Sequence, residues 1–222
     1  MNPRQIKNLL YEQVARIGKA ASSPKRLEFI ELLCQGEKNV EQLATEANIS
    51  VKLASAHLSG LKSASLVETR REGKNIYYRL ADPHVASFWV SIQTLAEERL
   101  VELQVALENL VASPEKLSPV GRTALLSEAA RGEVVVIDVR PETEYAAGHL
   151  PFARSIPLQE LKKRIAELPK DKTIVAYCRG PFCLMSEQAV KLLAQRGYQA
   201  RKIADGVADW QAAGLPLESE AS

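Results

Sequence analysis

Apolar residues recur at intervals of three or four along the first third of the chain, the spacing of a helix with one buried face. The spacing predicts three successive helices, over 4–20, from Pro24 to Gln35, and over 40–47. Ser50, a good N-cap residue, is expected to begin a fourth helix. The chain is therefore predicted to open with a small helical bundle.

The fourth helix is expected to have one apolar and one polar side. Its buried side should hold Leu53, Leu58 and Leu61. Its outward side should carry Lys52, Ser55 and Ser59. The pattern then changes to β-type runs over 66–71 and 76–80. The loop between the runs contains Gly73, which can supply a positive φ, so the two runs are predicted to form a hairpin.

One long helix is expected over 82–110, because apolar residues continue there at helical spacing. The stripe consists of Trp89, Ile92, Ala96, Leu100, Leu103, Leu107 and Leu110. Such a stripe needs a partner, either within the monomer or from a second copy. Residues 113–119 contain serine and proline and are expected to be a linker, after which strands and helices alternate. The predicted domains are thus 1–112, mainly helical (α+β), and 120–222, α/β.

Composition supports folded domains rather than disorder. The 222 residues are 46% hydrophobic, which is enough for real cores. The longest purely apolar run, 134–137, is far too short to cross a membrane, and no signal-like segment follows Met1, so a cytoplasmic protein without a membrane partner is expected. Three cysteines in a long chain indicate thiols with chemistry rather than disulfides.

Charge is unevenly distributed. Residues 1–81 carry 13 Lys and Arg against 8 Asp and Glu, whereas 82–112 carry one Arg against five acidic residues. A basic first segment attracts phosphates, but it also suits an ordinary solvated surface. Charge alone therefore leaves nucleic-acid binding open.

The order of elements in the first domain is that of a winged helix-turn-helix. The strings Ser55–Leu61 and Gly73–Leu80 resemble the ArsR/SmtB family of dimeric bacterial repressors, over about residues 5–110. The resemblance implies binding of double-stranded DNA by a homodimer at an inverted-repeat operator.

Residues expected to contact DNA lie on two elements. On the fourth helix, hydroxyls and one cation can reach base edges and phosphates from Ser50, Lys52, Ser55 and His57. On the hairpin, flanking phosphates or the minor groove can be reached by Arg70, Arg71 and Lys74. The alternative is a solvated helix face and hairpin, and His57 is equally well explained as a structural hydrogen-bonding residue.

The 82–110 helix is the expected dimer surface, because pairing it across a two-fold axis would place two recognition helices about one DNA turn apart. Many members of the family carry a Cys-x-Cys pair on the second helix, whereas this chain has only Cys34 there. His84 and His149 form no ligand spacing with Cys34, so neither a metal nor another cofactor is expected. Cys34 is better explained as a small buried hydrophobe.

The second domain contains four motifs in order: Asp138–Arg140, Glu144–Pro151, Tyr177–Gly180 and Asp205–Pro216. Together they resemble a single rhodanese domain, over about residues 117–217. The resemblance implies an α/β fold with a central parallel sheet and sulfurtransferase chemistry. The cysteine of the third motif would take the outer sulfur of a donor, become a persulfide, and pass the sulfur to a thiol acceptor.

That cysteine, Cys178, is expected between the strand over 173–177 and a helix over 185–196. Loop amides and the positive end of a helix stabilise an anion there and lower a thiol pKa. Asp138 and Arg140 are expected to organise the loop from the neighbouring strand end, and Arg179 completes the predicted catalytic set. A structural cysteine in an inactive rhodanese fold is the alternative.

The loop departs from the family pattern at one position. A typical member has a donor-binding arginine five residues after the cysteine, whereas Cys183 stands there in this chain. Thiosulfate is therefore a doubtful donor, and Phe182, Leu184 and Met185 suggest an apolar rim for a persulfide or organic donor. Cys183 is either a packed side chain or a resolving thiol that converts a persulfide or sulfenate at Cys178 into a disulfide.

Three functions fit these features. The first is a sulfur- or redox-responsive transcriptional regulator whose DNA binding is coupled to a persulfide at Cys178. The second is a sulfurtransferase whose helical domain mainly dimerises. The third is a DNA-binding regulator whose rhodanese domain is an inert sensor. They differ in whether sulfur is transferred and whether the two modules communicate.

Overall fold

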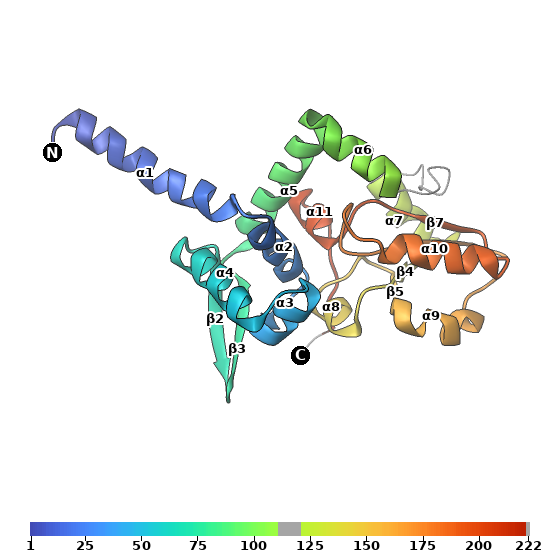
Figure 1. Cartoon of the computed structure of the whole chain (residues 1–222). Coiled ribbons are helices and arrows are strands. Elements are labelled where there is room, and N and C mark those ends of the chain that lie inside the picture. The colour runs from blue at the N-terminus through green and yellow to red at the C-terminus, as the bar shows by residue number, and fades with distance from the viewer. Residues whose placement is uncertain (111–120, 221–222) are drawn as a thin grey trace. The chain divides into compact units, whose positions relative to one another are not determined.

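The computed structural model describes residues 1–110 and 121–220, so the linker predicted over 113–119 lies outside the described residues. The chain divides into two compact units, Met1–Trp89 and Val90–Ser222. Figure 1 shows the first unit from blue to green and the second from green to red. In the part of the chain that the structure covers, no helix is long and apolar enough to span a bilayer.

The first unit is a winged helix-turn-helix, as predicted. Its helices are α1 (Pro3–Ala21), α2 (Pro24–Leu33), α3 (Val40–Glu46) and α4 (Val51–Ser63). Its antiparallel sheet has the order β1-β3-β2, with the bounds Lys38–Asn39 for β1, Val67–Glu72 for β2 and Asn75–Leu80 for β3. The four helices and the hairpin are confirmed, and Gly73 has a φ of 59° in the turn. The sequence did not indicate β1, because two residues carry no periodicity.

The buried side of α4 differs from the prediction at Leu53. Ala54, Leu58 and Leu61 are fully buried, whereas Leu53 is 46% exposed. The three buried positions are spaced by four and three residues, so they share the face that packs against α2 and α3. Leu53 lies about 100° around the helix from Ala54, which turns it to solvent.

The prediction of one helix over 82–110 is wrong. The structure has α5 (Pro83–Arg99) and α6 (Val101–Leu110), separated at Leu100. The side-chain amide of Gln104 donates to the backbone carbonyl of Glu97 at 2.7 Å. A continuous helix would assign that carbonyl to the Val101 amide. At the interruption, the Gln104 side chain therefore takes the backbone acceptor that a continuous helix would use.

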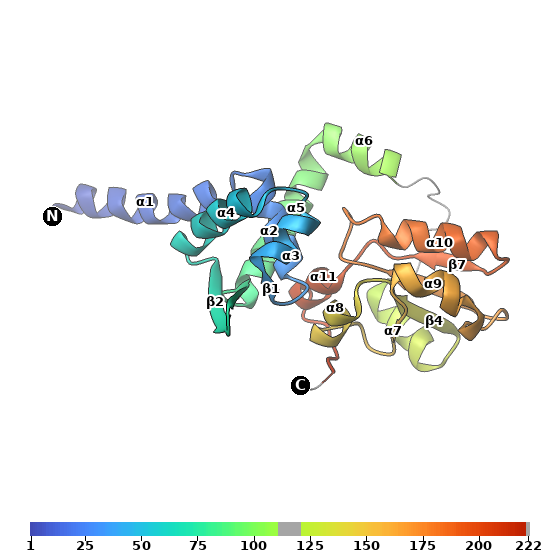
Figure 2. The same cartoon turned by 60° about the horizontal axis from the view of Figure 1, so that its bottom comes forward.

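The second unit is built on a four-stranded parallel sheet, which confirms the predicted α/β class (Figure 2). The strand order is β5 (Arg154–Ser155), β4 (Val134–Asp138), β6 (Thr173–Tyr177) and β7 (Ala200–Lys202). The helices are α7 (Arg122–Ala130), α8 (Glu142–Ala147), α9 (Leu158–Arg164), α10 (Met185–Gln195) and α11 (Val207–Ala212), with a 3₁₀ turn over Ile165–Glu167.

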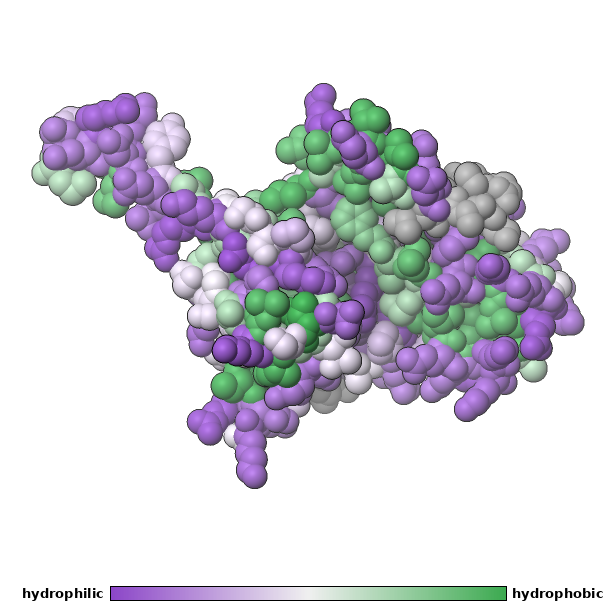
Figure 3. Space-filling view, viewed as in Figure 1, coloured by the Kyte–Doolittle hydropathy of each residue, from purple (hydrophilic) through white to green (hydrophobic). Residues whose placement is uncertain are grey.

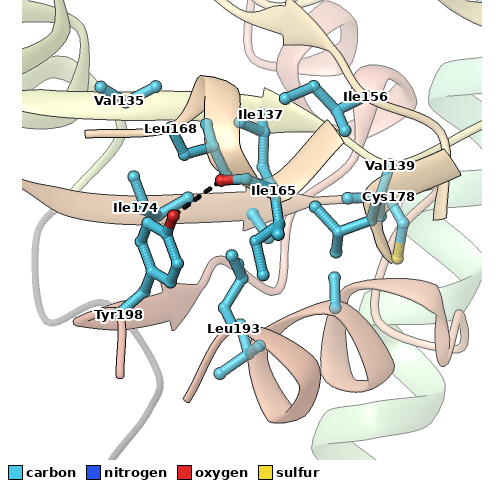
Figure 4. Close-up of a cluster of buried hydrophobic side chains, with 14 residues drawn as sticks. Val135, Ile137, Val139, Ile156, Ile165, Leu168, Ile174, Cys178, Leu193 and Tyr198 are labelled. Carbon is cyan, nitrogen blue, oxygen red and sulfur yellow. Dashed lines mark hydrogen bonds between the residues drawn. The ribbon is translucent and has the colours of Figure 1, made fainter. Parts of the chain in front are cut away.

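Successive residues of the central strands point to opposite faces of this sheet. Ile174 and Ala176 enter a cluster that includes side chains of α9 and α10, and Cys178 belongs to the same cluster. Val175 and Tyr177 enter a second cluster, which includes side chains of α7 and α11. Figure 4 shows Cys178 at one end of the first cluster. The alternation therefore places the Cys178 sulfur on the α10 face of the sheet.

Candidate functional site

Cys178 directly follows β6 and precedes α10 by a short loop. It is 1% exposed. Its Sγ atom lies 3.2 Å from Oγ of Ser186, which is buried in the first turn of α10, and 3.4 Å from the backbone carbonyl oxygen of Cys183. The sulfur is thus enclosed by the loop that follows it and by the beginning of the next helix.

The pKa of the Cys178 thiol is lowered to about 6. The largest cause is the hydrogen bond with the Cys183 thiol; the Ser186 hydroxyl and the backbone amides of Ser186 and Gly180 act in the same direction, while burial opposes them. A thiol with this pKa is mostly thiolate at neutral pH. Hydrogen bonds, rather than a neighbouring cation, are therefore the main cause of the lowered pKa of Cys178.

Cys183 lies in the same loop and is half-buried. Its interaction with Cys178 and its burial raise the pKa of the Cys183 thiol, so it stays protonated beside the Cys178 thiolate. Backbone amides of Arg179 and Met185 approach its sulfur and oppose this rise. We define the amide cradle as the backbone N–H groups of Arg179, Gly180, Met185 and Ser186. The cradle serves both sulfurs.

Two glycines allow the loop to take this shape. Gly180 has a φ of 150°, which other residues rarely adopt, and its carbonyl accepts from the Cys183 amide at 3.1 Å. A Cβ atom on Gly206 would lie 2.0 Å from the Arg179 carbonyl oxygen. The segment before α11 therefore packs on the loop backbone and holds it in place.

The guanidinium of Arg179, a predicted catalytic group, is bound to a carboxylate. Its Nε donates to Glu144 Oε2 at 3.0 Å and its Nη2 donates to Glu144 Oε1 at 2.5 Å. Glu144 belongs to α8 and is buried. Arg179 therefore ties the loop to α8, and its charge is compensated within the protein. This arrangement makes Arg179 a positioning residue.

Asp138 and Arg140 form a buried ion pair on the other face of the sheet. The Tyr177 hydroxyl donates to Asp138 Oδ2 and accepts from the Leu150 amide, and Arg140 Nη2 donates to the Gly148 carbonyl at 2.7 Å. Burial and Asp138 raise the Tyr177 pKa well above its ordinary value, so the hydroxyl keeps its proton. The pair therefore braces the ends of β4 and β6 beside Cys178.

Sequence reasoning missed Ser186, Glu144 and Tyr177 as members of the site. Ser186 carried a usable signal, because a hydroxyl in the first turn of the helix after a cysteine can approach its sulfur. Glu144 begins the second of the four rhodanese-like motifs, Glu144–Pro151, but its pairing with Arg179 links positions that are 35 residues apart. Such pairings depend on the tertiary fold and have no local signature.

On α4, the predicted DNA contacts divide into two kinds. Lys52 and Ser55 are exposed. The Ser50 hydroxyl accepts from the Leu53 amide at 3.3 Å and caps the helix. The His57 ring is half-buried and meets Phe29 edge-on, with 6.1 Å between the ring centroids. Ser50 and His57 therefore shape the helix, whereas Lys52 and Ser55 face solvent.

On the hairpin, the three predicted cations also differ. Arg70 is bound by Glu37 at 2.9 Å and by Glu72 at 2.8 Å, and its guanidinium lies 5.1 Å from the Tyr77 ring centroid. Arg71 and Lys74 are exposed at the tip. Arg70 therefore anchors the hairpin to the body of the unit, and the other two cations are placed to meet a partner.

The remaining cysteine and histidines lie elsewhere. Cys34 is half-exposed at the end of α2. His84 is exposed and its Nδ1 lies 3.1 Å from Asp82 Oδ1, while the Nδ1 atom of buried His149 lies 2.8 Å from the Tyr145 carbonyl oxygen. Within 1–110 and 121–220, no group of three or more His, Cys, Asp or Glu side chains could hold a metal ion.

Two family models match the chain. The model for bacterial regulatory proteins of the arsR family matches residues 23–69, and the model for the rhodanese-like domain matches residues 122–213. An HTH-type transcriptional regulator of Mycobacterium tuberculosis is 44% identical over 215 residues, which are 97% of this chain and 94% of that protein.

Two further similarities each concern one module. A sulfurtransferase of Allochromatium vinosum is 35% identical over 86 residues, which are 38% of this chain and 78% of that protein. A solution structure of the homodimeric winged helix-turn-helix DNA-binding domain of a possible ArsR-family regulator from Mycobacterium bovis is 44% identical. It covers 46% of this chain and 93% of that domain, with a TM-score of 0.42.

Proposed function

The chain belongs to the arsR family of bacterial transcriptional regulators and carries a rhodanese-like domain, and from this premise we propose that it is a sulfur-responsive regulator. In this proposal the winged helix-turn-helix binds DNA and Cys178 receives the sulfur signal as a persulfide. The observation that carries the proposal is the buried Cys178 sulfur itself, which lies 3.2 Å from the Ser186 hydroxyl at the start of α10; the hydrogen bonds around it lower its pKa.

The sulfur-transfer step follows from that ionised sulfur. The Cys178 thiolate attacks the outer sulfur of a donor persulfide, R–S–SH, and its electron pair forms a new S–S bond. The donor's S–S bond breaks and the donor leaves as the thiolate R–S⁻, which takes the proton of the transferred S–H group and departs as R–SH. Cys178 then carries the outer sulfur, whose negative charge the cradle amides stabilise. A thiol acceptor removes that sulfur by the same chemistry in reverse.

The structure favours persulfide or polysulfide donors over thiosulfate. Arg179 is neutralised by Glu144, so the loop offers thiosulfate no uncompensated guanidinium in the described residues. The rim of the loop is apolar, since Leu184 is exposed and Phe182 half-exposed. A donor with a small or apolar R group fits this rim better than a divalent anion does.

DNA binding is proposed for the exposed polar groups of the winged unit. Lys52 and Ser55 on α4 would reach bases and phosphates in the major groove, and Arg71 and Lys74 would hold flanking phosphates. Ser50, His57 and Arg70 would support this surface without being its main contacts. The exposed cations Lys52, Arg71 and Lys74 would contribute the salt-dependent part of the affinity.

A homodimer is proposed because three helices, α1, α5 and α6, expose large apolar side chains. On α1 these are Ile6, Leu9, Leu10, Tyr11 and Val14. At the end of α5, at the break and on α6 they are Leu95, Leu100, Val101 and Val105, and Figure 3 shows the hydrophobic surface over these elements. Apolar surface of this extent is stabilised by a second copy. Two copies would present two α4 helices to an inverted repeat.

The test is a DNA titration of the purified full chain, reduced and after treatment with inorganic polysulfide, for the wild type and Cys178→Ser. We expect treatment to change the affinity of the wild type and to leave Cys178→Ser unchanged, with Cys34→Ser behaving as the wild type. Sulfur uptake at Cys178 without any change in DNA affinity would instead support a sulfurtransferase whose helical module mainly dimerises. DNA binding with no uptake at Cys178 would support an inert rhodanese domain.

A further inference from the structure

The loop after β6 holds two thiols in one cradle of backbone amides. The Cys178 sulfur takes the amides of Gly180 and Ser186, and the Cys183 sulfur takes those of Arg179 and Met185. The Cys178 sulfur already lies 3.4 Å from the backbone carbonyl oxygen of Cys183. The Cys183 side chain therefore occupies the part of the loop in which the amides of Arg179 and Met185 could otherwise bind a small anion.

We propose that Cys183 is a second catalytic thiol, which attacks the persulfide carried on Cys178 and releases its outer sulfur as sulfide. This inference rests on the proposed persulfide. The Cys183 sulfur forms a bond to the inner sulfur, Cys178 Sγ, and the bond from that atom to the outer sulfur breaks. The outer sulfur leaves with the electron pair and takes the Cys183 proton and one from water, giving hydrogen sulfide and a Cys178–Cys183 disulfide.

The electrons balance within this step. The outer sulfur is reduced to sulfide, and the two cysteine sulfurs are oxidised to a disulfide. A dithiol then returns the disulfide to two thiols, so the complete cycle reduces a donor persulfide at the expense of a dithiol. The site would thereby convert a persulfide on Cys178 into a Cys178–Cys183 disulfide, which would persist after the donor has been consumed.

The position of Cys183 favours this step over attack by an external thiol. Both sulfurs sit on the loop between β6 and α10, and the Cys178 sulfur lies 3.4 Å from the backbone carbonyl oxygen of Cys183 itself. An internal nucleophile in contact with its target reacts as if present at very high concentration. Cys178 is 1% exposed, which disfavours a bulky external acceptor but does not affect Cys183.

The Cys183 thiol also carries the proton that the outer sulfur needs when it leaves as sulfide. Its thiol stays protonated beside the Cys178 thiolate, so it does not compete for the donor in the first step. After transfer, the negative charge moves to the outer sulfur, which is the atom that must be protonated as it leaves. The order of the two steps therefore follows from the different ionisation of the two thiols.

The experiment treats the full chain with sodium tetrasulfide, removes the reagent, and follows protein mass and released sulfide over time. A persulfide adds about 32 Da and an internal disulfide removes about 2 Da. We expect the wild type to release sulfide and to yield a peptide with the Cys178–Cys183 disulfide. Cys183→Ser and Cys183→Ala should retain the added mass on Cys178 and release sulfide at least about tenfold more slowly. Cys34→Ser is the matched control and should behave as the wild type.

Two results would overturn the inference, and they differ in what else they overturn. A wild-type persulfide on Cys178 that persists as long as in Cys183→Ser, with no disulfide, removes the role of Cys183 and leaves the proposed function standing. No added sulfur on Cys178 in the wild type or in either Cys183 variant, each shown to be folded by its circular dichroism, removes the persulfide and both proposals with it.

Discussion

Replacing Ser186 by alanine should raise the pKa of Cys178 and slow its reactions at neutral pH. The Ser186 hydroxyl lies 3.2 Å from the Cys178 sulfur and is buried, so no bulk water replaces it fully. A hydrogen bond to a charged group contributes about 1.5–3 kcal/mol. Since about 1.4 kcal/mol corresponds to one pKa unit, the loss should raise the pKa from about 6 to between about 7 and 8.

The assay is the rate of alkylation by iodoacetamide as a function of pH, measured on the Cys178 peptide by mass spectrometry. The wild type should show an inflection near pH 6. At pH 7 the thiolate is about nine tenths populated in the wild type, so Ser186→Ala should react about two- to tenfold more slowly there. Above pH 9 the two proteins should react at similar rates, because both thiols are then ionised.

Two controls separate the hydroxyl from general damage. Ser186→Thr keeps a hydroxyl and should keep the low inflection. Ser127→Ala removes a serine hydroxyl from α7, where it donates to the Thr123 carbonyl at 3.2 Å far along the chain from Cys178, and should leave the profile unchanged. An inflection near pH 8.5 in the wild type, or equal inflections in the wild type and Ser186→Ala, would refute the account of how Cys178 is ionised.

Three further outcomes are expected. Arg71→Ala and Lys74→Ala should each weaken binding to all DNA sequences and reduce the slope of log affinity against log salt by about one, measured by fluorescence anisotropy. Burial raises the pKa of Asp209 to about 6, so the contribution of this one carboxyl to stability is fully present below about pH 4 and is lost as the pH rises through 6. Asp209→Asn cannot ionise, so in urea unfolding its stability relative to the wild type should rise by up to about 3 kcal/mol between pH 4 and pH 7; a difference between the two proteins that does not change with pH contradicts the raised pKa. Leu10→Glu should lower the mass measured by light scattering from dimer to monomer, whereas the exposed polar substitution Gln13→Glu on the same helix should not.

Most of the fold could be predicted from the sequence because its elements are amphipathic or strongly apolar. The helices α1 to α3, the hairpin, β6 and α10 all begin and end within two residues of their predicted positions, and α4 begins directly after its predicted N-cap, Ser50. The break between α5 and α6 could not be predicted, because the helical spacing of apolar residues continues through Leu100 with no proline or glycine near it. Leu53 was wrongly predicted to be buried. The spacing of Leu53, Leu58 and Leu61 does not show that Ala54, rather than Leu53, shares the buried face of α4.

The site was less predictable than the fold, and cations show why. Arg70 and Arg179 were predicted to act through free charges; Glu72, two residues from Arg70, is a partner that the sequence offered, whereas their other partners are distant in the chain. In the structure Glu37 and Glu144 neutralise them from positions 33 and 35 residues away. The positions of the two thiols were easier to predict. Cys178 and Cys183 share one loop, and the sequence pattern places that loop between a strand and a helix. Local chemistry could therefore be predicted, and long-range charge pairing could not.

The absence of an uncompensated cation among the described loop residues bears on which sulfur compounds the site can accept. Cys178 is ionised by neutral donors, namely the amide cradle, the Ser186 hydroxyl and the Cys183 thiol. Neutral donors stabilise one negative charge well, because each hydrogen bond to an anion contributes about 1.5–3 kcal/mol. A divalent donor would bring two further charges beside an existing thiolate in a buried loop, which is strongly unfavourable without a cation. A persulfide or polysulfide brings at most one charge at its reacting end and leaves one charge behind on the transferred sulfur. The same neutral cradle that gives Cys178 its low pKa thus selects donors of low charge, and the second thiol in that cradle supplies the proton with which the transferred sulfur can leave.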